Sequence, residues 1–79
     1  MENKIYMETS ISPQAYVHPD AEIGEGCIIS PFAVIDGDVK LGRNCRIDSH
    51  AIIRDGARLG EDCQVFAGAI IASIPQDLK

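Results

Sequence analysis

A repeat of six residues runs through almost the whole chain and constrains its fold more than any other feature. From Ile11 to Ile71, every sixth residue is isoleucine, leucine or valine without exception. The residue two positions before an aliphatic one is alanine or cysteine at nine of ten positions, and Val39 is the tenth. The chain therefore repeats one short unit without an insertion, which is typical of a solenoid. The aliphatic positions are Ile11, Val17, Ile23, Ile29, Ile35, Leu41, Ile47, Ile53, Leu59, Val65 and Ile71.

The six-residue period fits a strand and excludes an amphipathic helix. Six residues turn an α-helix by roughly 240°, so the aliphatic residues would spread around its whole circumference. In a strand, residues two apart share a face, so the small and the aliphatic residue both point inward and the rest of the unit forms a corner. Three such sides close a triangular coil of eighteen residues, and Ile23-Gly24-Glu25, Leu41-Gly42-Arg43 and Leu59-Gly60-Glu61 recur at that spacing. The sequence predicts an all-β protein, a parallel β-helix of about three and a half coils.

The eighteen-residue spacing also predicts columns of side chains on the outside. Charged residues of opposite sign should stack on successive coils, in the order Glu25, Arg43, Glu61 and in part Glu22, Lys40, Arg58. We expect Gly24, Gly42 and Gly60 to stand before corners, where glycine supplies backbone freedom. An apolar column indicates an interface, and three parallel prisms would close it as a homotrimer. That column is Tyr16, Val34, Ile52 and Ile70.

Charge and composition exclude several classes of protein. The net charge is −5, from 7 basic and 12 acidic residues, which argues against binding nucleic acid through a basic surface. The longest nearly uncharged apolar stretch, 67–74, is too short to cross a bilayer, and the first ten residues have no apolar run typical of a secretory signal. We therefore expect a cytoplasmic protein without an integral membrane segment. Translation could start at Met1 or at Met7.

The two ends of the repeat suggest how the chain is organised. Residues 1–10 are expected to form an N-terminal cap or extension, residues 11–74 the β-helix, and residues 75–79 the start of a substrate-site loop. The repeat ends in an apolar stretch, and an open end of a β-helix is a sheet edge that would aggregate if left uncovered. We therefore expect the remainder of a longer protein to follow Lys79.

The histidines and cysteines have structural interpretations. His18 and His50 are 32 residues apart, which is a multiple of neither 6 nor 18, so they should not stack; we expect both near corners. A zinc site shared between subunits would need three histidines, so no metal site is predicted. Cys27, Cys45 and Cys63 should form an inward ladder of reduced thiols, because stacked strands hold their Cβ atoms too far apart and parallel for a disulfide.

More specific segments resemble one family. Three segments are similar to the opening coils of the acyl-[acyl-carrier-protein]–UDP-N-acetylglucosamine O-acyltransferases: Tyr16-Val17-His18-Pro19-Asp20-Ala21, Ile29-Ser30-Pro31-Phe32-Ala33 and Asp48-Ser49-His50-Ala51. A fourth segment, Gln76-Asp77-Leu78-Lys79, resembles that family's Gln-Asp-Leu-Lys motif. The resemblance covers residues 11–79, about the first third of a family member. It implies a left-handed coil, although right-handed parallel crossovers are the general preference.

The resemblance also implies a function. Members of this family transfer a 3-hydroxyacyl group from acyl carrier protein to the 3-hydroxyl of UDP-N-acetylglucosamine, the first step of lipid A biosynthesis. Carried over by position, Gln76, Asp77 and Lys79 would bind substrate in a cleft between subunits, where Lys79 offers a local cation to the nucleotide sugar. The family's general-base histidine lies beyond Lys79. The chain alone is thus expected to contain no catalytic residue, to need no cofactor and to be inactive.

Two other functions remain open from the sequence. A different hexapeptide-repeat sugar acyltransferase or acetyltransferase would share the repeat, although it would lack Gln76-Asp77-Leu78-Lys79 in this context. A non-catalytic trimerising scaffold would share it too. An ice-binding prism would need a flat threonine-rich face, and the only threonine is Thr9, outside the repeat.

Overall fold

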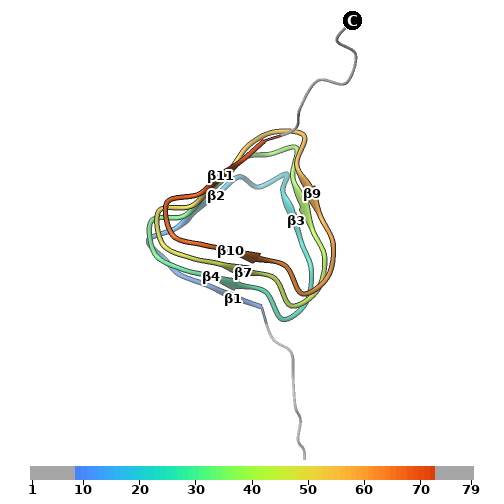
Figure 1. The fold of residues 1–79 in the computed structure, drawn as a ribbon, viewed down its shortest axis with the longest axis horizontal. Helices are drawn as coiled ribbons and strands as arrows, with labels where there is room; N and C mark the ends of the chain where they lie inside the picture. The colour runs from blue at the N-terminus through green and yellow to red at the C-terminus, as the bar shows by residue number, and fades with distance from the viewer. Residues whose placement is uncertain (1–8, 73–79) are drawn as a thin grey trace, which may run out of the picture.

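The chain winds into a stack of three-sided coils, seen almost end-on as nested triangles (Figure 1). The structure is a computed structural model, and it describes residues 9–72. Within this range, eleven strands of two residues each occupy the sides of the triangle. Strands of the same side pair in parallel, and they form three sheets. The predicted parallel β-helix built from six-residue repeats is confirmed.

Each sheet collects every third strand along the chain. Sheet A has the order β1 (Ser10–Ile11), β4 (Ile28–Ile29), β7 (Arg46–Ile47), β10 (Gln64–Val65). Sheet B has the order β11 (Ile70–Ile71), β8 (Ile52–Ile53), β5 (Val34–Ile35), β2 (Tyr16–Val17). Sheet C has the order β3 (Glu22–Ile23), β6 (Lys40–Leu41), β9 (Arg58–Leu59). The chain turns between them at an A–B corner, a B–C corner and a C–A corner.

The strand register places residues eighteen apart directly over one another. In sheet C, Ile23 pairs with Leu41 and Leu41 pairs with Leu59. Sheets A and B have the same offset, so every aliphatic residue of the repeat has another one above or below it. Because side chains alternate across a strand, this register sends the second residue of every strand into the tube and the first residue outward.

The interior of the tube is the hydrophobic core, and it consists of the two residue columns that the repeat predicts. Ile35, Ile47 and Ile53 are fully buried at the aliphatic positions, as are Ala33 and Cys45 at the small ones. No polar or charged side chain is buried among the described residues. A small residue beside each aliphatic one fits a narrow triangular tube, because two large side chains per side would overfill it.

Hydrogen bonds between successive coils hold the stack together. The backbone N–H of Ser10 donates to the carbonyl of Cys27 at 2.8 Å, and the same pattern extends to the last coil, where Arg54 N–H donates to the carbonyl of Ile71 at 2.7 Å. These bonds run parallel to the axis of the tube. Each coil therefore depends on its neighbours for its backbone pairing, as in other solenoids.

Gly24, Gly42 and Gly60 do not supply the backbone freedom that was expected of them. Their backbones do not lie in the left-handed region; the C–A corner instead uses Gly26, Asn44 and Asp62 there, with φ of 76°, 62° and 63°. A Cβ on Gly24 would lie 2.7 Å from the carbonyl carbon of Gly42, and one on Gly42 would lie 2.7 Å from that of Gly60. Glycine is therefore required at Gly24 and Gly42 because the next coil approaches closely, not because of backbone freedom, whereas nothing described lies within 4 Å of a Cβ built on Gly60.

The predicted charge columns form in part. Arg43 Nη2 lies 3.5 Å from Glu61 Oε2, and Lys40 Nζ lies 3.9 Å from Glu22 Oε1. Arg58 does not extend the second column, since its Nη2 lies 2.7 Å from Asp38 Oδ1 at the B–C corner. These pairs are largely exposed, so each stabilises the fold by about 1 kcal/mol or less.

The part of the chain described by the structure contains no helix long and apolar enough to cross a membrane. The strands run from Ser10 to Ile71. The cap expected over residues 1–10 falls mostly outside the described residues, and so does the loop expected over residues 75–79. Both remain predictions.

Candidate functional site

The residues expected to bind substrate, Gln76, Asp77 and Lys79, lie outside the described residues. The described part of the chain offers two surface features. One is a hollow at the B–C corner, and the other is the apolar surface of sheet B with the A–B corner beside it.

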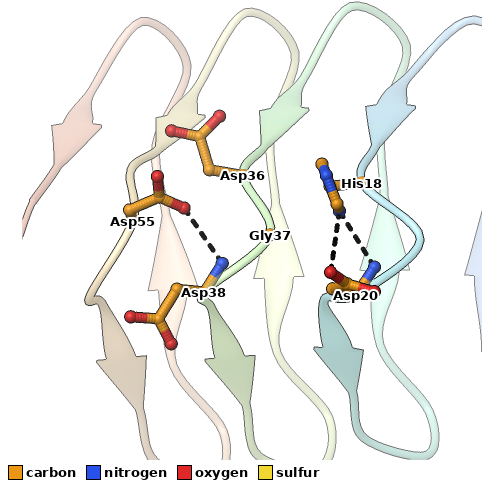
Figure 2. A pocket seen from close by; sticks show the side chains of 6 residues that line it. All are labelled: His18, Asp20, Asp36, Gly37, Asp38 and Asp55. Atoms are coloured by element: carbon orange, nitrogen blue, oxygen red, sulfur yellow. Dashed lines mark hydrogen bonds and ion pairs between the residues drawn. The ribbon is translucent and has the colours of Figure 1, made fainter.

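The hollow is open, has a volume of about 570 Å³, and is lined by residues from three successive coils (Figure 2). Its position follows from the register, because positions 18, 36 and 54 lie at the same place on successive turns. Four carboxylates and one imidazole surround it. The lining residues are His18, Asp20, Asp36, Gly37, Asp38 and Asp55.

The side chain of His18 binds the backbone of its own corner. Its Nδ1 accepts a hydrogen bond from the backbone N–H of Asp20 at 3.0 Å, so Nδ1 carries no proton in this arrangement. Asp20 Oδ2 lies 4.0 Å from the same nitrogen (Figure 2). The ring lies against Gly37, where a Cβ would be 2.8 Å from Nδ1. His18 therefore lies at a corner, as expected.

The carboxylates of the hollow brace the corner as well. Asp55 Oδ1 accepts a hydrogen bond from the backbone N–H of Asp38 at 2.9 Å (Figure 2). Asp38 in turn receives two bonds from Arg58, at its Oδ1 and at its carbonyl oxygen, at 2.7 and 2.8 Å. Arg54 Nε lies 3.7 Å from Asp36 Oδ2. Each of these interactions links one coil to the next.

These contacts give the hollow a structural role. Within residues 9–72 no group of three histidine, cysteine or acidic residues is placed to hold a metal ion. Around the hollow, His18 binds the backbone of its own corner, Asp55 binds the backbone of the neighbouring coil, and Asp36 and Asp38 pair with arginines of the next coil. None of these side chains forms the nucleophile–base pair that covalent catalysis uses. Sequence reasoning missed the hollow, although the spacing of His18, Asp36 and Arg54 by eighteen residues carries the signal.

The three cysteines form the expected inward ladder of free thiols. Cys27 and Cys45 are buried, and Cys63 is half-buried. The Cys27 thiol donates to the carbonyl of Gly42 at 3.1 Å, and the Cys45 thiol donates to that of Gly60 at the same distance. Burial raises the pKa of the Cys45 thiol, a hydrogen bond with the Cys63 backbone partly offsets this, and the neighbouring cysteines raise it further.

We expect Cys45 to resist alkylation in the folded protein. Its raised pKa leaves less thiolate at a given pH, and the thiolate is the reactive form. Iodoacetamide at pH 8 should modify half-buried Cys63 well before Cys45, whereas both should react equally in urea; mass spectrometry of peptides measures this. Equal labelling of both thiols in the folded state would contradict this account.

The raised pKa of Cys45 also predicts how stability depends on pH. Because the thiol ionises at lower pH in the unfolded chain than in the folded one, the free energy of unfolding should fall as pH rises above about 9.

The expected outward apolar column forms on sheet B. Tyr16 pairs with Val34, Val34 with Ile52, and Ile52 with Ile70, each on the outer side of its strand. Tyr16 and Ile70 at the two ends are 52% and 61% exposed, and the middle two side chains are half-buried. The A–B corner precedes these strands, and there the ring of His50 stacks on Phe32 with centroids 5.3 Å apart. His50 thus lies at a corner, as expected, and apart from His18.

Comparison with known proteins agrees with the repeat. The family model described as "Bacterial transferase hexapeptide (six repeats)" matches residues 8–37. No curated protein matches the chain.

Among solved structures, one match is a mutant of perosamine N-acetyltransferase from Caulobacter crescentus in complex with CoA and GDP-perosamine. It is 22% identical, with a TM-score of 0.35, and the alignment covers 92% of this chain and 50% of that one. The chain thus spans half the length of that protein. The register and the three parallel sheets show a β-helix built from six-residue repeats, and the family model of the bacterial hexapeptide transferases matches its first coils.

Proposed function

We propose that this chain is the N-terminal β-helix portion of an acyltransferase that moves a 3-hydroxyacyl group from acyl carrier protein to the 3-hydroxyl of UDP-N-acetylglucosamine, the first step of lipid A biosynthesis. The observation that carries the proposal is Gln76-Asp77-Leu78-Lys79, which follows an uninterrupted repeat and resembles the substrate-site motif of that family. The transferase family model on residues 8–37 supports the general class of reaction. The proposal places the enzyme in the cytoplasm as a homotrimer.

The proposed reaction is acyl transfer from a thioester to an alcohol. The sugar hydroxyl oxygen attacks the thioester carbonyl carbon, its proton passes to a general base, and the carrier thiol leaves. We assign the base to a histidine outside this chain, since His18 is bound to its own corner and His50 is stacked on Phe32. The chain's own contribution would be binding: Lys79 would bind the anionic diphosphate, and Gln76 and Asp77 would bind polar groups of the sugar or the acyl chain.

The test uses the full protein that contains this chain, with 3-hydroxyacyl carrier protein and UDP-N-acetylglucosamine, and mass spectrometry of the product. We expect the acylated nucleotide sugar to form, and Lys79→Met to lower kcat/KM by about 10- to 100-fold, because a hydrogen bond to a charged group is worth about 1.5–3 kcal/mol. Lys40→Met is the matched control, since Lys40 lies on the outer surface of sheet C beside Glu22, and it should change kcat/KM by less than about twofold.

Other results would reject the proposal. Acetylation of a different nucleotide sugar from acetyl-CoA, with no product from the acyl carrier protein, would favour another sugar acetyltransferase of the same repeat. If no acyl or acetyl donor gives a product, the chain would instead belong to a non-catalytic trimerising scaffold. The 79-residue chain alone is expected to give no product under the same conditions.

A further inference from the structure

The B–C corner contains two aspartyl-glycine pairs, Asp36–Gly37 on one coil and Asp55–Gly56 on the next. In such a pair the glycine nitrogen can attack the side-chain carboxyl carbon of the aspartate, because glycine has no Cβ to block the approach. The product is a five-membered succinimide ring. The rate in a folded protein depends on how firmly the surrounding structure holds the two reacting groups, and the two pairs differ in this respect.

Hydrogen bonds to the previous coil hold both reacting groups of Asp55–Gly56. The N–H of Gly56 donates to the carbonyl oxygen of Asp38 at 2.7 Å. Asp55 Oδ1 accepts a hydrogen bond from the backbone N–H of Asp38 at 2.9 Å (Figure 2). Attack of the Gly56 nitrogen on the Asp55 carboxyl carbon would require both of these bonds to break.

The groups of Asp36–Gly37 are held less firmly. Among residues 9–72, the N–H of Gly37 donates to no backbone carbonyl, and the φ of Gly37 lies outside the left-handed region. Asp36 Oδ2 lies 3.7 Å from Arg54 Nε, and the Arg54 side chain is 58% exposed, so this ion pair holds the carboxylate weakly. Figure 2 shows the Asp36 side chain in the hollow beside Gly37, apart from the bond that joins Asp55 to Asp38.

We propose that Asp36 is a site of spontaneous isomerisation to isoaspartate in the folded protein, and that the hydrogen bonds of the corner protect Asp55. The Gly37 nitrogen attacks Asp36 Cγ in the protonated carboxyl group, and the hydroxyl leaves with the nitrogen's proton as water. A water molecule then opens the ring. Attack of this water at Cγ restores aspartate, whereas attack at the main-chain carbonyl carbon gives isoaspartate, so the net mass does not change. This inference does not depend on the proposed function.

Isoaspartate at position 36 would lengthen the main chain by one atom between β5 and β6. The two strands belong to different sheets, and each is fixed in register to the next coil. The corner between them would have to accommodate the added atom, although the His18 ring already lies against Gly37 there. We therefore expect the isoaspartate form to unfold at a lower urea concentration than the unmodified protein.

The test is prolonged incubation of the full protein at pH 7 in water enriched in oxygen-18, followed by digestion and mass spectrometry. Each opening of the succinimide ring places one heavy oxygen in the peptide that contains the reacting aspartate. We expect Asp36 to gain the label about tenfold faster than Asp55, because two hydrogen bonds must break at Asp55 and each typically slows the step by about 2- to 12-fold. In guanidinium chloride both should gain it at about the same rate, because the corner is then absent.

The comparison is made within one wild-type chain, so it does not depend on whether a variant folds. Asp36→Glu adds a second check, because a glutamate would have to close a less favourable six-membered ring; the label at position 36 should disappear while that at Asp55 stays as in the wild type. Equal or faster labelling of Asp55 in the folded protein would overturn the proposal. So would a folded protein that leaves Asp36 unlabelled while guanidinium chloride allows both residues to react.

Discussion

Gly42→Ala is expected to lower the free energy of unfolding by about 3 kcal/mol, near the upper end of the range for inserting a methyl group into a packed interior. The added Cβ would lie 2.7 Å from the carbonyl carbon of Gly60 and 2.9 Å from the backbone nitrogen of Glu61. These are backbone atoms of the next coil, which are held by the hydrogen bonds between coils and cannot turn away as a side chain could. Relief of the contact would require two coils to separate, and this would also weaken the Cys45 thiol bond to Gly60.

Gly60→Ala is the matched control for this prediction. Gly60 occupies the same column, but no described atom lies within 4 Å of a Cβ built there. Neither glycine lies in the left-handed region, so backbone strain does not separate the two variants. Gly60→Ala should change the free energy of unfolding by less than about 1 kcal/mol. Urea denaturation followed by circular dichroism measures both, and equal effects would show that coil stacking does not select glycine here.

The glycine column shows where sequence reasoning about this fold reaches its limit. A period of six with a small residue two positions before each aliphatic one determines which residues point inward, and the register of Ile23, Leu41 and Leu59 follows from it. The same period does not give the distance between backbones at a corner. Backbone freedom and close approach both favour glycine, and only coordinates separate them: Gly42 lies against the next coil, whereas Gly26 has φ of 76°.

The sequence predicts which outward side chains share a column on the surface, but not which of them contact one another. Spacing by eighteen residues correctly aligned Tyr16 with Val34, and Arg43 with Glu61. It did not indicate that Arg58 would turn from its own column to Asp38 at the B–C corner, because a long side chain reaches several neighbours and the best hydrogen-bond geometry selects one. The stacking of Phe32 on His50 was also missed, although their separation of eighteen residues places them on successive coils. The spacing gives that position, but at a corner the alternation of strands gives no rule for the direction of the side chains. Gln76, Asp77 and Lys79 remain predictions from sequence resemblance.

The second large effect is expected inside the tube, where two neighbouring isoleucines of β4 provide a direct comparison. Ile29 points into the core and is 2% exposed, whereas Ile28 points outward and is 41% exposed. Ile29→Ala should lower the free energy of unfolding by about 2–5 kcal/mol, because it removes buried methyl groups and leaves a cavity between the coils above and below. Coils that are fixed by hydrogen bonds on both sides cannot collapse into that cavity, which favours the upper part of the range.

Ile28→Ala removes the same atoms from the same strand, so helix or strand propensity cannot distinguish the two variants. Its side chain already contacts water, and we expect a loss of less than about 1 kcal/mol when unfolding is measured at concentrations low enough to keep the chains apart. Urea denaturation of both variants gives the difference. A loss from Ile28→Ala as large as that from Ile29→Ala would mean that the side chains of β4 do not alternate between core and solvent. The inward six-residue register would then be wrong, together with the parallel β-helix on which the proposed function depends.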